Sequence, residues 1–241
     1  WEAKIEIDGA ARFLEYYAAQ AEAVEGSSIP LGDGYLDFTL REPIGVSAQI
    51  IPWNFPLEMI ARGIGPALAT GNPCVIKTPE LTPLACSYFA KAAEAAELPT
   101  GALNILCGLG RVAGAALVAH PGVNQVVFTG SVETGRAAAE AAGRNLVPCV
   151  LELGGKSAAI VYEDADLDRV LADLRWGIFY NAGQICSAMS RVVVQESLKE
   201  EFLARAAELA RSISTGPGLD RPEVGANMGS LVSDSQLQHV A

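Results

Sequence analysis

Cys186 and Glu152 are the two side chains whose types and surroundings point most directly to covalent chemistry. Cys186 lies in the run Phe-Tyr-Asn-Ala-Gly-Gln-Ile-Cys-Ser-Ala, where Gly183 permits a tight backbone and the residues after the cysteine are small. No second cysteine stands near it in the sequence to suggest a disulfide or a pair of metal ligands. Glu152 lies upstream in Leu-Glu-Leu-Gly-Gly-Lys. The thiol is a candidate nucleophile and the carboxylate is a candidate general base.

Each of these residues also has a structural interpretation. A lone cysteine in an apolar stretch is usually a small buried hydrophobic residue. Glu152 ends the apolar run 147–151, so it could be a strand-end carboxylate that faces solvent, or one half of a structural salt bridge. A charged residue in such a run is otherwise costly unless it is paired or functional. Other motifs in the chain favour the catalytic interpretation.

Three further motifs stand in the same chain. They are Ile-Ile-Pro-Trp-Asn-Phe-Pro at 50–56, Val-Ile-Lys-Thr-Pro-Glu at 75–80 and Val-Phe-Thr-Gly-Ser-Val-Glu-Thr-Gly at 127–135. Together with the segments of Glu152 and Cys186, their order and spacing resemble the NAD(P)-dependent aldehyde dehydrogenase superfamily. The resemblance runs from about Trp1 to the end of the sequence. One such motif would be a weak signal, whereas five in order are a strong one.

The resemblance implies oxidation of an aldehyde to its carboxylic acid with NAD(P) as the hydride acceptor. An aldehyde loses a hydride easily only after a nucleophile has made its carbonyl carbon tetrahedral, and a thiol with a pKa of about 8.5 supplies enough thiolate for this. Cys186 is then the nucleophile that carries a thiohemiacetal and a thioester. Glu152 is the general base for the water that hydrolyses the thioester.

The resemblance also implies an oxyanion hole made by the side-chain amide of Asn54 and the backbone N–H of Cys186. An ordinary turn asparagine between Pro52 and Pro56 is the alternative for Asn54. Lys77 is expected to serve both the catalytic centre and the cofactor. No metal ion is expected to take part.

The prediction of a cofactor site rests on strand–turn–helix segments, because no Gly-x-Gly-x-x-Gly motif follows a strand. Gly130 and Ser131 are expected at a helix N-terminus, which attracts phosphate, although they could form an ordinary N-cap. Lys77 and Glu80 follow a strand that reads as buried, and they are expected to hold the adenine ribose. A solvated surface pair is the alternative for these two.

Glu80 favours NAD over NADP, because a carboxylate accepts a hydrogen bond from the 2′-hydroxyl group and repels a 2′-phosphate. NADP remains the alternative cofactor. Gly110 and Gly114 could equally mark a turn and a close helix contact. The full set of cofactor contacts expected by analogy is Ile51, Pro52, Trp53, Lys77, Glu80, Gly110, Gly114, Phe128, Gly130, Ser131, Thr134, Leu153 and Gly154.

The composition indicates a soluble intracellular protein. The chain has 241 residues, of which 50% are hydrophobic, enough for a large core. A net charge of −11, without a lysine and arginine cluster, argues against nucleic acid or an anionic membrane as partner. No apolar run is long enough to span a bilayer and no signal peptide is present, so a cytoplasmic location is expected. The five cysteines are scattered without Cys-x-x-Cys spacing and are expected to be reduced.

Short apolar strands alternate with helices along most of the chain. This pattern predicts an α/β fold with an open, largely parallel, Rossmann-like sheet, followed by the start of a second α/β domain. Strands are expected at 46–51, 75–77, 103–106, 125–129, 147–152, 158–161 and 192–195. Helices are expected at 3–23, 56–69, 85–97, 113–118, 134–142, 167–180 and 198–213, with a further helical run at 233–241.

The resemblance suggests a domain organisation. Residues 1–24 and 41–153 are expected to form the NAD-binding domain, and residues 154–241 the start of the catalytic domain. The segment 25–40 contains turn formers and an alternating strand pattern, and is expected to be an oligomerisation arm. An isolated surface hairpin is the alternative. The sequence is expected to be a fragment covering about the middle half of a homodimeric or homotetrameric protein, and to be inactive alone.

Two other functions compete with hydrolytic aldehyde oxidation. A coenzyme A-acylating aldehyde dehydrogenase would need no general base, so Glu152 argues against it. A non-catalytic NAD-binding or structural protein of the same fold would have no use for Asn54, Glu152 and Cys186 together. The identity of the aldehyde stays open between apolar, aromatic and amino aldehydes. Residues expected near the substrate tunnel are Glu58, Arg62, Trp176, Phe179, Ile185 and Ser187.

Overall fold

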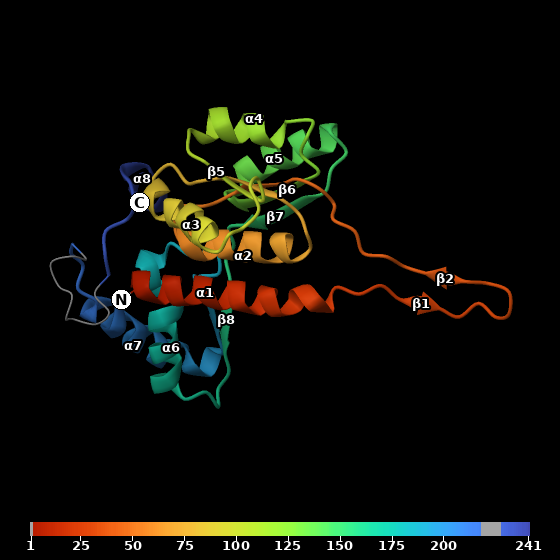
Figure 1. The fold of residues 1–241 in the computed structure, drawn as a ribbon. Helices are drawn as coiled ribbons and strands as arrows, with labels where there is room; N and C mark the ends of the chain where they lie inside the picture. The colour runs from red at the N-terminus through yellow and green to blue at the C-terminus, as the bar shows by residue number, and fades with distance from the viewer. Residues whose placement is uncertain (1, 218–227) are drawn as a thin grey trace. The chain divides into compact units, whose positions relative to one another are not determined.

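The computed structural model describes residues 2–217 and 228–241. It divides into two compact units, residues 2–153 and residues 154–241 (Figure 1). Each unit has its own hydrophobic core. Among the described residues, no helix combines the length and the apolar character that crossing a membrane requires.

The first unit is built on a sheet of five parallel strands. The strands are β3 (Ser47–Ile50), β4 (Cys74–Lys77), β5 (Leu103–Leu106), β6 (Gln125–Gly130) and β7 (Cys149–Leu153). Their order across the sheet is β5-β4-β3-β6-β7. The chain therefore runs outward from β3 to β5 and then returns to place β6 on the other side of β3. This reversal of order leaves a crevice at the carboxyl ends of β3 and β6, where ligands of open α/β sheets bind.

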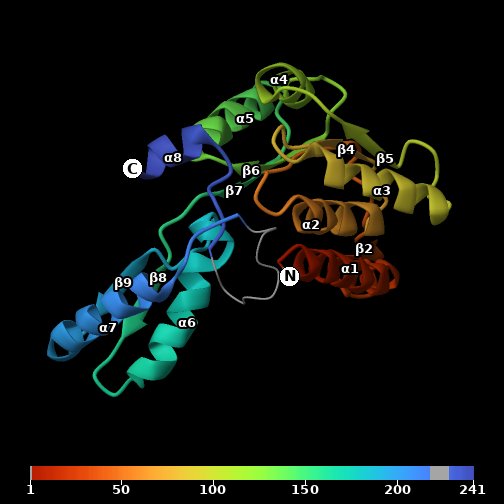
Figure 2. The same cartoon turned by 90° about the vertical axis from the view of Figure 1, so that its left-hand side faces the viewer.

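Helices cover both faces of the sheet. The helices are α1 (Glu2–Gln20), α2 (Pro56–Ala69), α3 (Pro83–Ala95), α4 (Ala115–Val118) and α5 (Val132–Arg144). Figure 2 shows α1, α2 and α3 on one side of the sheet and α4 and α5 on the other. Ile60 of α2 and Ile76 of β4 are fully buried in the core of the first side, and Val126 of β6 is fully buried in that of the second. The predicted parallel sheet covered on both faces is confirmed.

Several element boundaries agree with the prediction and others differ for local reasons. Helix α2 spans the predicted 56–69, with a proline in its first turn, and β5 spans the predicted 103–106. Helix α5 begins before the predicted position 134, because the Ser131 side chain caps the helix from the residue before it. The predicted helix 113–118 begins earlier, as one turn of π-helix at Gly110–Gly114. Strand β7 begins later than 147, because Leu146 has a left-handed backbone (φ 54°).

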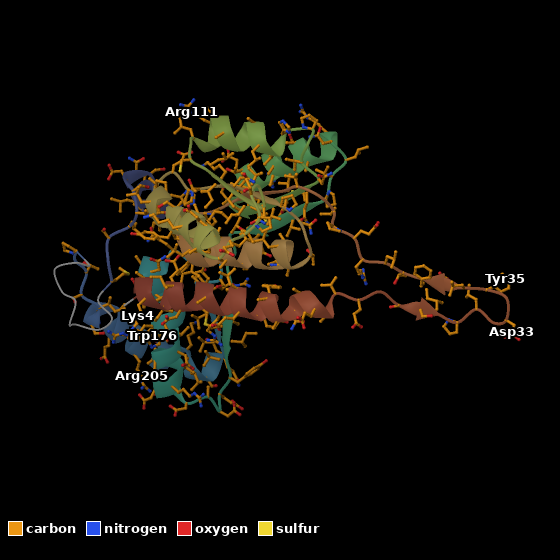
Figure 3. All side chains as sticks on the ribbon, in the orientation of Figure 1. Lys4, Asp33, Tyr35, Arg111, Trp176 and Arg205 are labelled. Carbon is orange, nitrogen blue, oxygen red and sulfur yellow. The ribbon has the colours of Figure 1, made fainter. Side chains whose placement is uncertain are left out.

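A two-stranded hairpin joins α1 to the sheet. A 3-10 turn (Ala21–Ala23) ends the first helical segment, and β1 (Ser28–Ile29) then pairs antiparallel with β2 (Asp37–Phe38). Asp33 and Tyr35 lie at the tip of the hairpin (Figure 3). Tyr35 is 75% exposed and Leu36 is 84% exposed, which is unusual for large hydrophobic side chains.

The second unit packs two helices on a small parallel sheet. Strands β8 (Ala158–Val161) and β9 (Arg191–Val194) pair in parallel, and α6 (Leu167–Phe179) and α7 (Lys199–Ser212) form a core with them that includes the buried Leu171 and Phe202. Short 3-10 turns cover Tyr180–Gly183 and Glu196–Leu198, and α8 (Asp234–Val240) follows later in the chain.

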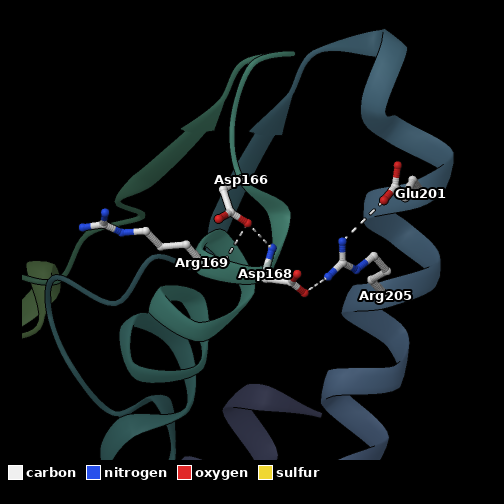
Figure 4. Close-up of polar contacts among 5 residues, drawn as sticks. All are labelled: Asp166, Asp168, Arg169, Glu201 and Arg205. Carbon is white, nitrogen blue, oxygen red and sulfur yellow. Dashed lines mark hydrogen bonds and ion pairs between the residues drawn. The ribbon is translucent and has the colours of Figure 1, made fainter.

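Polar side chains cap the N-terminus of α6 and connect this helix to α7 (Figure 4). The carboxylate of Asp166 accepts hydrogen bonds from the backbone N–H groups of Asp168 (3.0 Å) and Arg169 (3.4 Å), which caps the helix N-terminus. Arg205 of α7 pairs with Asp168 and with Glu201, the latter at 3.4 Å. The two carboxylates are largely exposed, so these ion pairs contribute little to stability, and only the pair with Asp168 links α7 to α6.

Candidate active site

The segment after β3 carries Asn54 at the carboxyl edge of the sheet, between β3 and α2. Ile51 is buried and its backbone N–H donates to the carbonyl of Lys77 at 3.2 Å, which extends the sheet by one step. The chain then bends through Pro52 and Trp53, whose side chains are half-buried, and enters α2 at Pro56. The Trp53 carbonyl accepts a hydrogen bond from the Thr82 hydroxyl at 3.2 Å. The half-buried Asn54 is therefore presented from a short connection that is held by the neighbouring strand segment.

Lys77 and Glu80 meet at the carboxyl end of β4. The Lys77 side chain is 5% exposed, and its Nζ lies 3.7 Å from Glu80 Oε1. The same Glu80 oxygen accepts a hydrogen bond from the backbone N–H of Gly110. A Cβ atom at Gly110 would lie 3.1 Å from that oxygen, so glycine is what permits this approach. A solvated surface pair is therefore ruled out for Lys77, whose ammonium group is buried beside a carboxylate and a turn of backbone.

The turn after β6 provides a helix N-terminus. Ser131 caps α5, with its Oγ accepting from the Thr134 backbone N–H at 3.2 Å and lying 3.0 Å from the Thr134 hydroxyl. Both side chains are exposed, so the first turn of α5 is accessible to an anion. Phe128 is buried beneath this turn, because its ring lies under Gly130, where a Cβ would be 2.7 Å from the ring. Phe128 therefore supports the turn from below.

Gly114 lies beside Lys77, and Leu153 lies beside the first turns of α5. Gly114 is buried in the π-helical turn, and a Cβ there would be 4.0 Å from the Lys77 side chain. Leu153 ends β7, and a Cβ at Gly135 of α5 would lie 2.6 Å from its side chain. Glycine at 135 thus lets α5 pack directly on the end of β7.

Glu152 lies in a more open place than its sequence suggests. The apolar run before it predicts a buried strand, but its side chain is 52% exposed. The reason is the position of β7 at an edge of the sheet, where Val150 and Leu151 are also exposed. Glu152 Oε2 lies 3.6 Å from Arg62 Nη2 of α2. The carboxylate is thus both paired and accessible to water, in a groove of about 730 Å³ that Ile51 and Arg62 also line.

Cys186 belongs to the second unit and lies in a tight exposed turn. The Ala188 N–H donates to the Ile185 carbonyl at 3.1 Å and closes the turn around the cysteine. The Cys186 carbonyl accepts from the Gly155 N–H at 3.2 Å. A Cβ at Gly155 would lie 3.1 Å from that oxygen, so the glycine allows the two segments to meet. Nothing crowds Gly154, whose Cβ would meet no atom within 4 Å.

The backbone before Cys186 holds three consecutive left-handed residues. Asn181 (φ 50°), Ala182 (φ 55°) and Gly183 (φ 74°) all have positive φ. Glycine adopts this conformation freely, whereas alanine does so at a cost of about 1–2 kcal/mol. Asn181 and Gln184 bond to each other's carbonyl groups, at 3.5 Å and 3.0 Å. A strained segment of this kind beside a thiol is typical of functional sites.

The cysteines differ in their capacity to act as nucleophiles. Burial raises the pKa of Cys74 to about 12. Burial, with Cys107 nearby, raises the pKa of Cys86 to about 11, and burial also raises the pKa of Cys149. Thiols of this kind stay protonated and unreactive at neutral pH. The two exposed cysteines are Cys186 and Cys107, and the Cys107 sulfur accepts a hydrogen bond from the Thr78 hydroxyl at 3.4 Å.

Within the first unit, the predicted residues lie at or just after the carboxyl ends of β3, β4, β5, β6 and β7, which a parallel sheet places along one edge. Cys186 and Gly154 belong to the second unit. Sequence reasoning missed Glu6, Thr82 and Gly155, which hold the segments of Asn54 and Cys186. The repeated glycine of Leu-Glu-Leu-Gly-Gly-Lys was the one available signal, for Gly155.

Comparison with known proteins identifies one family over the whole chain. The family model described as "Aldehyde dehydrogenase family" matches residues 1–241. Retinal dehydrogenase 2 of Gallus gallus is 46% identical over 217 residues, which are 90% of this chain and 42% of that protein. An aldehyde dehydrogenase of Aspergillus niger is 48% identical over 237 residues, 98% of this chain and 48% of the relative. The chain thus spans about half the length of the curated relatives it matches.

Solved structures of the same kind superpose closely. The NAD+ complex of aldehyde dehydrogenase from Bacillus cereus matches with a TM-score of 0.92 and 40% identity, over 98% of this chain and 47% of that one. The NAD-dependent aldehyde dehydrogenase from Sinorhizobium meliloti matches with a TM-score of 0.90 and 36% identity, over 98% and 46%. The sequence motifs, the strand order and these matches agree, and the chain belongs to the aldehyde dehydrogenase family.

Proposed function

We propose that the protein carrying this chain oxidises an aldehyde to its carboxylic acid with NAD as the hydride acceptor, and that Cys186 is the nucleophile. The observation that carries the proposal is the exposure of Cys186 in a turn pinned by Gly155, in a chain where burial raises the pKa of three other thiols. Cys107, the other exposed cysteine, follows β5 and accepts a hydrogen bond from the Thr78 hydroxyl, and it serves as a comparison.

In the proposed reaction, the Cys186 sulfur attacks the aldehyde carbon to form a thiohemiacetal. Asn54 and the Cys186 backbone N–H stabilise the oxyanion. Loss of the hydride leaves a thioester on Cys186. Glu152 then takes a proton from water, which attacks the thioester and releases the acid and the free thiol. The half-exposed carboxylate of Glu152, held beside Arg62, is consistent with a base that must reach water.

The carboxyl ends of β4 and β6 fit a dinucleotide. The buried ammonium group of Lys77 and the Glu80 carboxylate suit the adenine ribose, and the capped N-terminus of α5 at Ser131 suits the pyrophosphate. When bound, NAD supplies the acceptor for the hydride. The remaining proposed contacts are Ile51, Pro52, Trp53, Gly110, Gly114, Phe128, Gly130, Thr134, Leu153 and Gly154. The Bacillus cereus structure named above holds NAD+, which supports this choice of cofactor.

The larger organisation is part of the same proposal. Residues 1–24 and 41–153 serve as the cofactor domain and residues 154–241 as the start of the catalytic domain. The hairpin within 25–40 exposes large apolar side chains, which supports its use as an assembly arm in a homodimer or homotetramer. A cytoplasmic location is proposed from the composition. The residues near the substrate tunnel include Trp176, which is 50% exposed.

Trapping of the acyl intermediate tests the reaction. The full-length protein is treated with hexanal or benzaldehyde, with and without NAD, quenched in acid and digested for mass spectrometry. We expect an acyl adduct on the peptide of Cys186 that depends on NAD and accumulates in Glu152→Gln. Cys186→Ala should lose the adduct, and the matched Cys107→Ala should keep it. An adduct that appears only on Cys107, or none on any cysteine while NAD binds, would overturn the proposal.

A further inference from the structure

The N-terminus of α2 has no cap of its own. The residue before the helix is Phe55, whose side chain makes no capping bond, and the first helical residue is Pro56, which has no N–H. The first N–H groups that need an acceptor therefore belong to Leu57 and Glu58. In most helices a serine, threonine or aspartate immediately before the helix would accept from them.

Glu6 of α1 supplies the missing acceptor. Its Oε1 accepts from the Leu57 N–H at 2.6 Å and lies 3.4 Å from the Glu58 nitrogen. Burial raises the pKa of Glu6 above its ordinary value, the two backbone N–H groups oppose this shift, and the nearby Glu58 carboxylate adds to it. Glu6 and Leu57 are 51 residues apart in the sequence. The partly buried Glu6 carboxylate therefore links α1 to the N-terminus of α2.

This tether acts next to Asn54. Only Phe55 and Pro56 separate Asn54 from the first residue that Glu6 holds. On the other side, the Trp53 carbonyl is held by the Thr82 hydroxyl at 3.2 Å. Helices α1 and α2 also pack closely through small residues, since a Cβ at Gly65 would lie 2.7 Å from the Tyr17 side chain. The bend that carries Asn54 is therefore anchored at both ends by side chains from other elements.

We propose that Glu6 is a positioning residue for the reaction, which sets the place of the Asn54 amide by holding the N-terminus of α2. The proposal rests on the proposed function, because it needs Asn54 to serve as an oxyanion donor. It assigns Glu6 no contact with substrate or cofactor. Loss of the tether frees the first turn of α2, and a catalytic group that moves by about 1 Å loses roughly 100-fold in rate.

The test measures kcat and KM of the full-length protein for an aliphatic aldehyde and for NAD. Glu6→Ala should lower kcat about 10- to 100-fold, less than the roughly 100- to 1,000-fold expected for Asn54→Ala. KM for NAD should stay unchanged. Glu6→Gln keeps an acceptor oxygen of the same reach and should stay within about fivefold of the parent protein. Glu6→Asp keeps the charge but shortens the reach, and should lose activity even if Glu6→Ala does not fold.

The double variant distinguishes positioning from general loss of stability. If Glu6 acts through Asn54, then either Glu6→Ala or Glu6→Asp should lower kcat little further once Asn54 is already alanine. The matched control is Asp166→Ala, which removes another carboxylate that bonds to two N–H groups of a helix N-terminus, at 3.0 and 3.4 Å in α6. That variant should lose stability with kcat nearly unchanged.

Four results would overturn the inference. Losses that multiply in the double variant, or Glu6 variants with full kcat while Asn54→Ala is impaired, would show that Glu6 does not act through Asn54. An equal loss of kcat in Asp166→Ala would mean that any missing helix cap has this effect. Full activity of Asn54→Ala would instead refute the role of Asn54 in the proposed function, and the role of Glu6 would fall with it.

Discussion

Gly155→Ala should disturb Cys186, the proposed nucleophile, and leave the affinity for NAD unchanged. Gly155 donates its N–H to the Cys186 carbonyl at 3.2 Å, and its added Cβ would stand 3.1 Å from that same oxygen. The Cys186 turn is closed by a further backbone bond between Ala188 and Ile185. The turn would therefore have to move as a unit to make room.

The size of the effect follows from the distance. Ordinary contacts of this kind begin near 3.4 Å, so the carbonyl must retreat by a few tenths of an ångström. If a displacement of 1 Å lowers the rate roughly 100-fold, a displacement of this size should lower it about three- to tenfold. The affinity for NAD should not change, because the clash is with the backbone of the nucleophile.

Rapid mixing of the full-length protein with aldehyde and NAD separates these quantities. Under the proposed function, the amplitude and rate of the first turnover report acylation of Cys186, and a titration of NAD gives its dissociation constant. Gly143→Ala is the matched control, because a Cβ there meets no atom within 4 Å and the residue is an exposed position of helix α5. An unchanged acylation rate in Gly155→Ala, or a loss as large in Gly143→Ala, would refute the reasoning.

Three further predictions concern the cofactor site and stability. Glu80→Gln removes the charge that repels a 2′-phosphate, and should raise kcat/KM for NADP relative to NAD by about tenfold; an unchanged ratio would contradict this. Ser131→Ala removes the cap of α5, bonded at 3.2 Å, and should destabilise the protein by about 1 kcal/mol and weaken NAD binding, as calorimetry can measure. Cys74, with its pKa raised to about 12, contributes stability that is lost as the pH rises toward that value, because only the unfolded thiol ionises readily. In urea unfolding, the free energy of unfolding should fall between pH 8 and pH 10 by about 2 kcal/mol more in the parent protein than in Cys74→Ala, and equal losses would count against this.

The edge position of β7 gives Glu152 the access to water that its proposed role in hydrolysis requires. A fully buried carboxylate favours its protonated form and has no path to water. Glu152 is 52% exposed and lies 3.6 Å from the Arg62 guanidinium, so a positive charge stands close to it. Exposure gives water access to the carboxylate, and the ion pair orients it. Both features agree with the role of general base.

Local sequence determined much of the secondary structure. The proline and the apolar residues of 56–69 fit a helix that begins at Pro56, and the short, mostly apolar run 103–106 fits a strand. The alternation of such elements was enough to predict a parallel sheet with helices on both faces. The order of the motifs at 50–56, 75–80 and 127–135 indicated the family, because the order and spacing of motifs can be read from the sequence without the structure.

Tertiary structure alone decided how the site is held. Glu6 reaches the Leu57 N–H over 51 residues, and the Gly155 N–H reaches the Cys186 carbonyl across the intervening helix α6. The exposure of Glu152 depended on which strand became the edge of the sheet, which its own apolar run could not indicate. Propensity and periodicity are properties of neighbouring residues, whereas caps, close contacts and solvent exposure depend on which distant segments meet. The sequence therefore determined which residues could act, and the packing of strands and helices determined how each one is supported.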